Sequence, residues 1–112
     1  MKYVAKPQMT MATLKVLREL SKDSSKGHYG LELCRATNLP SGTIYPILRR
    51  LEREGWIESD WEKINPSEAG RPRRRLYKID PSWLEQIRYE LATAHQTFAQ
   101  VPWAPRPQGE LA

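Results

Sequence analysis

Five basic side chains and no acidic one lie within residues 71–78, just after a glycine and around a proline. Guanidinium groups bind phosphate, often through two parallel hydrogen bonds, and they can also enter a narrow minor groove of DNA. We predict that Arg71 and Arg73, at the turn, contact a nucleic-acid backbone, with Arg74 beside them. The alternative is that Arg74 or Lys78, further along the strand, pairs with an acid of the preceding strand. The acids within reach are Glu58, Asp60 and Glu62.

A second group of polar side chains lies on an amphipathic helix before this stretch. Ile44, Leu48 and Leu51 recur at helical spacing and predict a helix from Ser41 to Gly55, a residue suited to a left-handed cap. Near the start of such a helix, side chains can contact base edges and flanking phosphates. The predicted DNA-contacting residues of this helix are Ser41, Thr43, Tyr45, Pro46 and Arg49. A merely solvated helix is the alternative, but it does not account for the basic stretch that follows.

The overall composition favours a polyanion as partner. The 112 residues carry a formal net charge of +5, and 39% of them are hydrophobic. From residue 81 onward there are only two basic and three acidic residues, so the positive charge is local. A chain of this length predicts one small domain that gains stability by self-association. A local basic surface predicts binding to nucleic acid.

The single cysteine and the absence of long apolar runs bear on the compartment. One cysteine, Cys34, excludes an internal disulfide and favours a reducing compartment. No apolar run approaches the ~18 residues that span a bilayer, and the start lacks the apolar core of a signal peptide. We therefore expect a cytoplasmic protein with no membrane partner.

Hydrophobic periodicity predicts the elements that position these groups. Helices are expected over residues 10–20, 28–37, 41–55 and 81–101, with strands starting at Ile57 and Arg73 and a loop from Asn65 between them. The first two helices are expected to bury Met11, Leu14, Val16, Leu17, Leu20, Leu31, Leu33 and Cys34. The acids that alternate from Glu58 to Glu62 are expected on the solvated face of their strand. The predicted fold is mainly α with a two-stranded β-wing, a winged helix-turn-helix followed by a C-terminal dimerisation helix.

The fourth helix carries apolar residues at alternating three- and four-residue steps, the spacing of a seam between two helices. The predicted dimerisation residues are Leu84, Ile87, Leu91 and Phe98. Packing against the chain's own core is the alternative. A dimer would place two recognition helices about 34 Å apart on a palindromic site. The predicted organisation is a DNA-binding domain over 1–80, a dimerisation helix over 81–101 and a flexible proline-rich tail over 102–112.

Other chemistry-bearing residues give weaker signals. Trp83 and Trp103 flank the fourth helix and could line a cavity for an aromatic ligand, although buried anchors are the commoner use of tryptophan. Cys34 is expected to be a small buried apolar group. His28 and His95, with one cysteine between them, are too sparse for a structural zinc site, so no metal or cofactor is predicted. The sequence has no glycine-rich phosphate loop and no nucleophile with an obvious base, so no enzyme is predicted.

Three segments together resemble the PadR family of transcriptional regulators: HYGLELC, TIYPILRRLEREGWIESDW and GRPRRRLYKI. The resemblance covers about residues 10–80. It implies a winged helix-turn-helix, a dimer formed through a C-terminal helix and operator binding that usually represses transcription. It places the DNA-facing helix at 41–53 and the wing at 65–75. The single C-terminal helix is similar to the smaller branch of that family, some of whose members bind planar aromatic compounds between subunits.

The function expected from the sequence is a homodimeric, sequence-specific repressor that binds double-stranded DNA at a palindromic operator. Two alternatives stay open. The winged helix could serve as a protein-interaction module whose wing arginines bind an acidic partner. A small aromatic effector in the dimer cavity could also gate the repressor.

Overall fold

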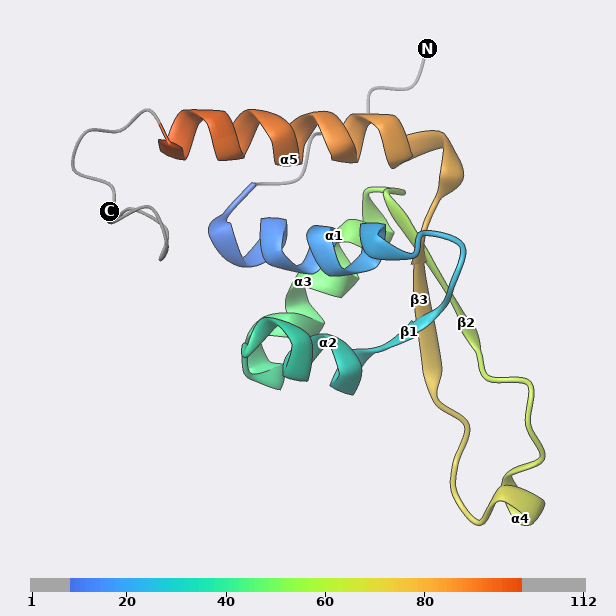
Figure 1. The fold of residues 1–112 in the computed structure, drawn as a ribbon. Coiled ribbons are helices and arrows are strands. Elements are labelled where there is room, and N and C mark those ends of the chain that lie inside the picture. Colours follow the sequence, from blue (N-terminus) through green and yellow to red (C-terminus); the bar gives the residue numbers. More distant parts are fainter. Residues whose placement is uncertain (1–8, 100–112) are drawn as a thin grey trace.

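The computed structural model describes residues 9–99, with the side chains of the last helix described as far as Ala94 (Figure 1). A mainly helical body carries a long hairpin, confirming the predicted fold class. The elements are α1 Met11–Lys22, β1 His28–Tyr29, α2 Gly30–Thr37, α3 Ser41–Arg53, β2 Ile57–Trp61, α4 Pro66–Ala69, β3 Arg75–Ile79, the 3-10 turn η1 Pro81–Trp83 and α5 Leu84–Ala99. The predicted tail over 102–112 lies outside the described residues.

The sheet has three antiparallel strands in the order β1-β3-β2, one more than the sequence predicted. The extra strand is only two residues long, with His28 opposite Tyr77 and Tyr29 opposite Leu76. Helix α2 therefore begins at Gly30 and not at His28. The backbone N–H of Tyr29 donates to Glu32 Oε1 at 2.9 Å, which caps the start of α2. A two-residue strand is too short to show an alternating pattern, so no sequence signal marks it.

One apolar core joins the helices and the base of the sheet. Its fully buried members include Leu17 of α1, Leu48 of α3 and Ile79 of β3. Met11 and Leu31 were predicted to be buried, but both are exposed. Thr13 takes the inward position near the start of α1, on the side that carries Leu17. The buried side of α2 is formed by Gly30, Leu33 and Thr37, and Leu31 points away from it.

Local capping sets the ends of the helices. The hydroxyl of Thr10 accepts a hydrogen bond from the Thr13 N–H at 3.1 Å and caps α1. Asn38 takes the left-handed conformation after α2, with φ 58°, and α3 starts just after Pro40. Gly55 follows the end of α3 with φ 82°, a backbone conformation that residues other than glycine adopt only at a cost in free energy. Asn38 and Pro40 therefore separate α2 from α3, and a short turn joins the two helices.

Figure 1 shows how the elements are arranged around this turn. Helix α5 lies along α1, and α2 and α3 lie on the other side of α1. The hairpin of β2 and β3 extends away from the helices, with α4 at its far end. Helix α3 and the hairpin therefore both belong to the same compact domain.

Candidate nucleic-acid interface

Helix α3 is anchored by one face and presents a polar face to solvent. Ile44, Leu48 and Leu51 have no exposed surface, which fixes the rotation of the helix about its axis. Five residues of this helix were predicted to contact DNA. Of these, Ser41, Pro46 and Arg49 are exposed, and Thr43 and Tyr45 are partly buried. The start of α3 thus presents hydroxyl groups, and the Arg49 guanidinium is exposed further along the same helix.

Tyr45 is held in place by α2. Gly30 is buried, and a Cβ atom built on it would lie 2.5 Å from the Tyr45 hydroxyl oxygen and 2.6 Å from a ring carbon. The phenol therefore rests directly on the Gly30 backbone, and only a glycine leaves room for it. This contact sets the position of a predicted DNA-contacting side chain.

Gly30→Ala is expected to displace the Tyr45 ring and to destabilise the protein by about 1–3 kcal/mol, the usual cost of overpacking. Chemical denaturation measures the loss. The double variant with Tyr45→Ala should recover part of it, because the clashing ring is then gone. An additive loss in the double variant would show that the two residues do not contact each other.

The hairpin tip contains a short helix where the sequence predicted only a loop. In α4 the Asn65 side chain accepts from the Ser67 N–H at 3.0 Å, Pro66 is the first helical residue and Gly70 closes the helix with φ 70°. An asparagine cap, a proline at the first position and a glycine after the end form a recognisable signal. The predicted loop therefore holds a single helical turn, and β3 starts at Arg75 rather than Arg73.

The Arg71 side chain, which was predicted to contact a nucleic-acid backbone, is hydrogen-bonded within the hairpin. Its guanidinium donates two hydrogen bonds to Glu62, at 2.7 Å to Oε1 and 2.8 Å to Oε2. The Tyr29 hydroxyl donates to Glu62 Oε2 at 2.6 Å, and the backbone N–H of Arg74 donates to Oε1 at 3.1 Å. Glu62 is only 8% exposed, so its expected place on a solvated face is wrong. We call Tyr29, Glu62 and Arg71 the wing lock.

The wing lock has clear electrostatic consequences. Hydrogen bonds from Arg71, and next from Tyr29, lower the pKa of Glu62 from 4.5 to about 2. The same bonds raise the pKa of the Tyr29 hydroxyl and of the Arg71 guanidinium. A carboxylate with a lowered pKa stabilises the folded state above its unfolded pKa, and this contribution is lost as the pH falls towards the folded value.

Glu62→Gln is expected to lower the thermal stability by a constant amount from pH 7 down to about 5. Below that the two proteins should converge as the pH approaches 2, because the wild-type carboxylate becomes protonated there. Thermal unfolding of both proteins across this range measures the difference. A difference that stays constant down to pH 2.5 would contradict the assignment of the lowered pKa to Glu62.

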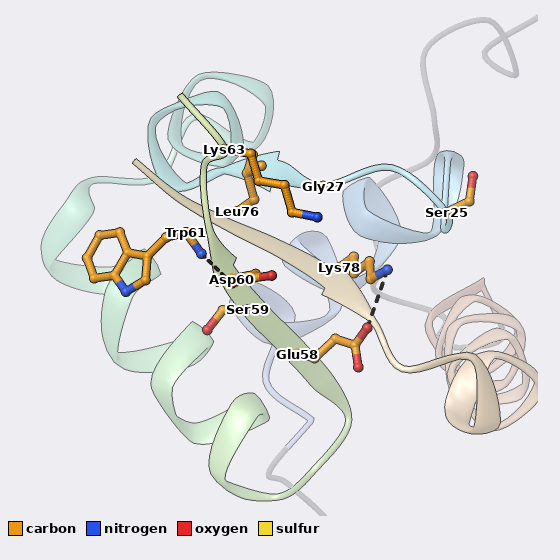
Figure 2. A pocket seen from close by; sticks show the side chains of 9 residues that line it. All are labelled: Ser25, Gly27, Glu58, Ser59, Asp60, Trp61, Lys63, Leu76 and Lys78. Atoms are coloured by element: carbon orange, nitrogen blue, oxygen red, sulfur yellow. Dashed lines mark hydrogen bonds and ion pairs between the residues drawn. The ribbon is translucent and has the colours of Figure 1, made fainter. Parts of the chain in front are cut away.

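Two cations of the wing remain exposed, Arg73 and Arg74. Arg73 donates from Nε to the Ile64 carbonyl at 3.0 Å, which leaves its terminal nitrogens available. The Arg74 guanidinium lies over the Tyr29 ring, 5.2 Å from the ring centroid. The predicted cross-hairpin pairing is made by Lys78, whose Nζ lies 3.4 Å from Glu58 Oε1 (Figure 2).

Arg75, which was not predicted to have a role, connects the sheet to α3. It donates from Nε to Ser59 Oγ at 2.9 Å and lies 4.9 Å from the centroid of the Trp61 ring. Ser59 in turn donates to Glu52 of α3 at 2.5 Å. Arg75 lies directly opposite Trp61 in the ladder, so cross-strand pairing was the signal that could have found this contact. These bonds fix the angle between α3 and the hairpin.

Comparison with known proteins defines the family. The model of the transcriptional regulator PadR-like family matches residues 16–82, more than half of the chain. The protein belongs to the PadR-like family. The matched region runs from α1 to η1 and includes α3 and the whole hairpin. This PadR-like protein is therefore a transcriptional regulator with a winged-helix DNA-binding fold, and its relatives by family are not enzymes.

Solved structures share the fold of the PadR-like protein at low sequence identity. A PadR family transcription regulator from Clostridium difficile is 23% identical, with a TM-score of 0.60 over 81% of this chain and 97% of that one. A PadR-like transcription factor from Bacteroides fragilis is 21% identical, with a TM-score of 0.56 over 80% and 87%. The PcaV regulator from Streptomyces coelicolor, solved with its natural ligand, is 20% identical, with a TM-score of 0.69 over 94% and 68%. No curated protein matches the chain.

In the PadR-like protein three of the four predicted dimerisation residues turn towards the chain's own core. Ile87 is fully buried there, and Leu84 and Leu91 are partly buried against the same cluster. These three residues thus pack against the chain's own core, which was the alternative left open by the spacing. The Phe98 side chain lies outside the described part of the helix. Among the side chains of α5 described up to Ala94, Tyr89 is a large apolar one that is exposed, at 64%.

The remaining predicted residues have structural positions. Trp83 stacks on the buried Trp56, with ring centroids 4.8 Å apart, so it serves as an anchor for the core; Trp103 lies outside the described residues. Cys34 is half-buried against the core. Within residues 9–94, no group of three or more potential ligands is placed to hold a metal ion. None of the described helices is long and apolar enough to cross a membrane.

Proposed function

We propose that this PadR-like protein is a homodimeric repressor that binds a palindromic site in double-stranded DNA. The observation that carries the proposal is the position of α3 relative to the wing. The polar face at the start of α3 is accessible, and the bonds of Arg75 hold α3 at a fixed angle to the hairpin. This hairpin exposes Arg73 and Arg74. A helix of 13 residues fits the major groove, and cations beside it reach the neighbouring phosphates.

The groups on each element suggest separate roles. Ser41 and Thr43 carry hydroxyls that hydrogen-bond base edges or phosphates, and Arg49 is placed further along α3. Arg73 and Arg74 would bind phosphate, which gives affinity without sequence preference. Arg71 is assigned to the wing lock and would support the turn without contacting DNA.

In the proposed dimer, α5 would form the interface between the two subunits. Its inward residues hold it on the core, while Tyr89 and the partly exposed Leu84 and Leu91 remain available to a second copy. A two-fold pair would present two α3 helices one turn of duplex apart, about 34 Å. The bound site would then be a palindrome.

Selection of bound fragments from random duplex DNA tests the proposal directly. The expected result is an enriched site with two inverted halves about one helical turn apart, bound by two copies of the chain. If no sequence is enriched and an acidic protein co-purifies with the chain, the winged helix acts as a protein-interaction module.

Gating by a small aromatic effector is the second candidate. Two regulators with a similar fold bind ligands: BpsR from Bordetella bronchiseptica is regulated by 6-hydroxynicotinic acid, and PcaV was solved with its natural ligand. Quenching of tryptophan fluorescence by planar aromatic compounds, together with release of DNA, would support this role. Quenching without any effect on DNA binding would not.

Changes on α3 and on the wing are expected to affect DNA binding differently. Thr43→Val should weaken binding to the selected site by about 1–3 kcal/mol per half-site with little effect on random DNA, because it removes a hydrogen bond to a base. Arg73→Ala should weaken binding to both kinds of DNA alike, because it removes a cation that binds phosphate. Fluorescence anisotropy with both duplexes measures the two effects. Equal losses on both duplexes for Thr43→Val would contradict its role in reading bases.

A further inference from the structure

A cavity of about 310 Å³ lies between the start of α2, the Tyr45 face of α3 and the strand β3. Its lining is dominated by three arginines and three tyrosines: Arg35, Arg74, Arg75, Tyr29, Tyr45 and Tyr77. Among the described residues that line it there is one acid, Glu32, and its carboxylate is used to cap α2 through the Tyr29 N–H. The cavity therefore has a net positive charge.

The cavity drawn in Figure 2 differs in this respect. It is larger, about 580 Å³, and lies on the hairpin beside the loop that follows α1. Two acids and two lysines line it, and one lysine, Lys78, already pairs with Glu58. Its charges balance, so it offers no preference for an anion.

The three arginines of the smaller cavity are not equally available. Arg75 is committed to Ser59, Trp61 and Glu52. The Arg74 guanidinium lies over the Tyr29 ring, and a guanidinium that contacts an aromatic ring keeps N–H groups for other partners. Arg35 is exposed on α2, and within residues 9–94 no acid pairs with it. Among the described residues that line this cavity, Arg35 of α2 and Arg74 of the wing are thus the two cations that remain available to bind an anion.

We infer that this cavity is a phosphate-binding site in which Arg35 and Arg74 hold one oxyanion between α2 and the wing. Guanidinium groups suit this ligand because their N–H donors match the geometry of phosphate oxygens. The Tyr45 hydroxyl, from α3, supplies a further donor at the same cavity. As a contact to the DNA backbone, the inference rests on the proposed function and adds α2 to the elements that hold the duplex. A free phosphate has the same chemistry, so both sources are tested.

Binding to the selected duplex is measured at several salt concentrations for the wild type and for Arg35→Gln and Arg74→Gln. Removing one phosphate-binding cation from each of two subunits flattens the log–log salt slope by about 1.8. This corresponds to a loss of about 60-fold at 0.1 M salt if the curves meet at 1 M. Lys78→Gln is the matched control, because it removes one charge from the other cavity, and its slope should equal that of the wild type. Circular dichroism confirms that each variant is folded.

Inorganic phosphate titrated into the DNA-free protein tests the second source. Saturable NMR shifts at the amides of Gly30, Leu31 and Arg74 that vanish in Arg35→Gln would show a site for free phosphate. A flattened slope without such shifts would assign the site to the DNA backbone alone. Wild-type slopes in both arginine variants, with no phosphate-dependent shifts, would overturn the inference. If the protein binds no duplex at all, the proposed function fails, and the phosphate titration alone decides whether the site exists.

Discussion

Raising the salt concentration from 50 to 200 mM is expected to weaken binding to duplex DNA by a factor of about 10⁴ to 10⁵. If each subunit of the proposed dimer neutralises about four or five phosphates, the log–log slope is about −7 to −9, because each neutralised phosphate releases condensed counterions. In the proposed complex, most of these interactions would come from the start of α3 and from the exposed cations Arg49, Arg73 and Arg74. Anisotropy titrations over this range measure the slope.

Removal of two wing cations provides the internal control for this expectation. Arg73→Ala combined with Arg74→Ala should flatten the slope by about 3.6, since a dimer then neutralises about four fewer phosphates. Arg71→Ala should leave the slope nearly unchanged, because its guanidinium is already bound by Glu62. A wild-type slope near zero would contradict binding through phosphates and would favour an acidic protein as partner.

Trp56→Ala is expected to destabilise the protein by about 3–5 kcal/mol, a large share of the stability of a small domain. Trp56 is fully buried in the core between α3 and β2, and its ring stacks on Trp83 at 4.8 Å. The substitution therefore removes a large side chain and also the stacking that joins the winged helix to the start of α5. Urea unfolding followed by circular dichroism measures the loss.

Two other tryptophan variants sharpen this test. Within the described part of the chain, the buried Trp56 Nε1 atom has no hydrogen-bond partner. Trp56→Phe therefore removes an unsatisfied donor and should cost less than alanine. Trp61 is 53% exposed, and Trp61→Ala should cost far less again. Equal losses for Trp56→Ala and Trp61→Ala would show that the Trp56 stack does not anchor the core.

The helical part of the fold was predictable because local signals agreed with the packing. Thr10, the Asn38–Pro40 break and Gly55 marked the helix ends, and the spacing of Ile44, Leu48 and Leu51 marked the buried face of α3. The strand β1 was not predictable, because two residues carry no periodicity. Met11 was misplaced because an apolar residue at a helix end can face either side.

The candidate site was predictable in its residue types but not in which cations are free. Among the wing arginines, only interactions across the fold distinguish Arg71 from Arg73. Arg71 is captured by Glu62, and that carboxylate is buried by Tyr29, which lies 33 positions earlier in the chain. Arg35 was overlooked for a similar reason, since only the folded chain brings α2 beside the wing.

The wing lock also limits how the hairpin can be exchanged between relatives. Two of its members, Glu62 and Arg71, lie in the hairpin, whereas Tyr29 comes from the short strand before α2. A hairpin transplanted alone from this protein would leave its tyrosine behind, and the carboxylate would lose one of its donors. Designers of chimeric regulators would have to move both segments together, and natural recombination within this stretch would face the same constraint.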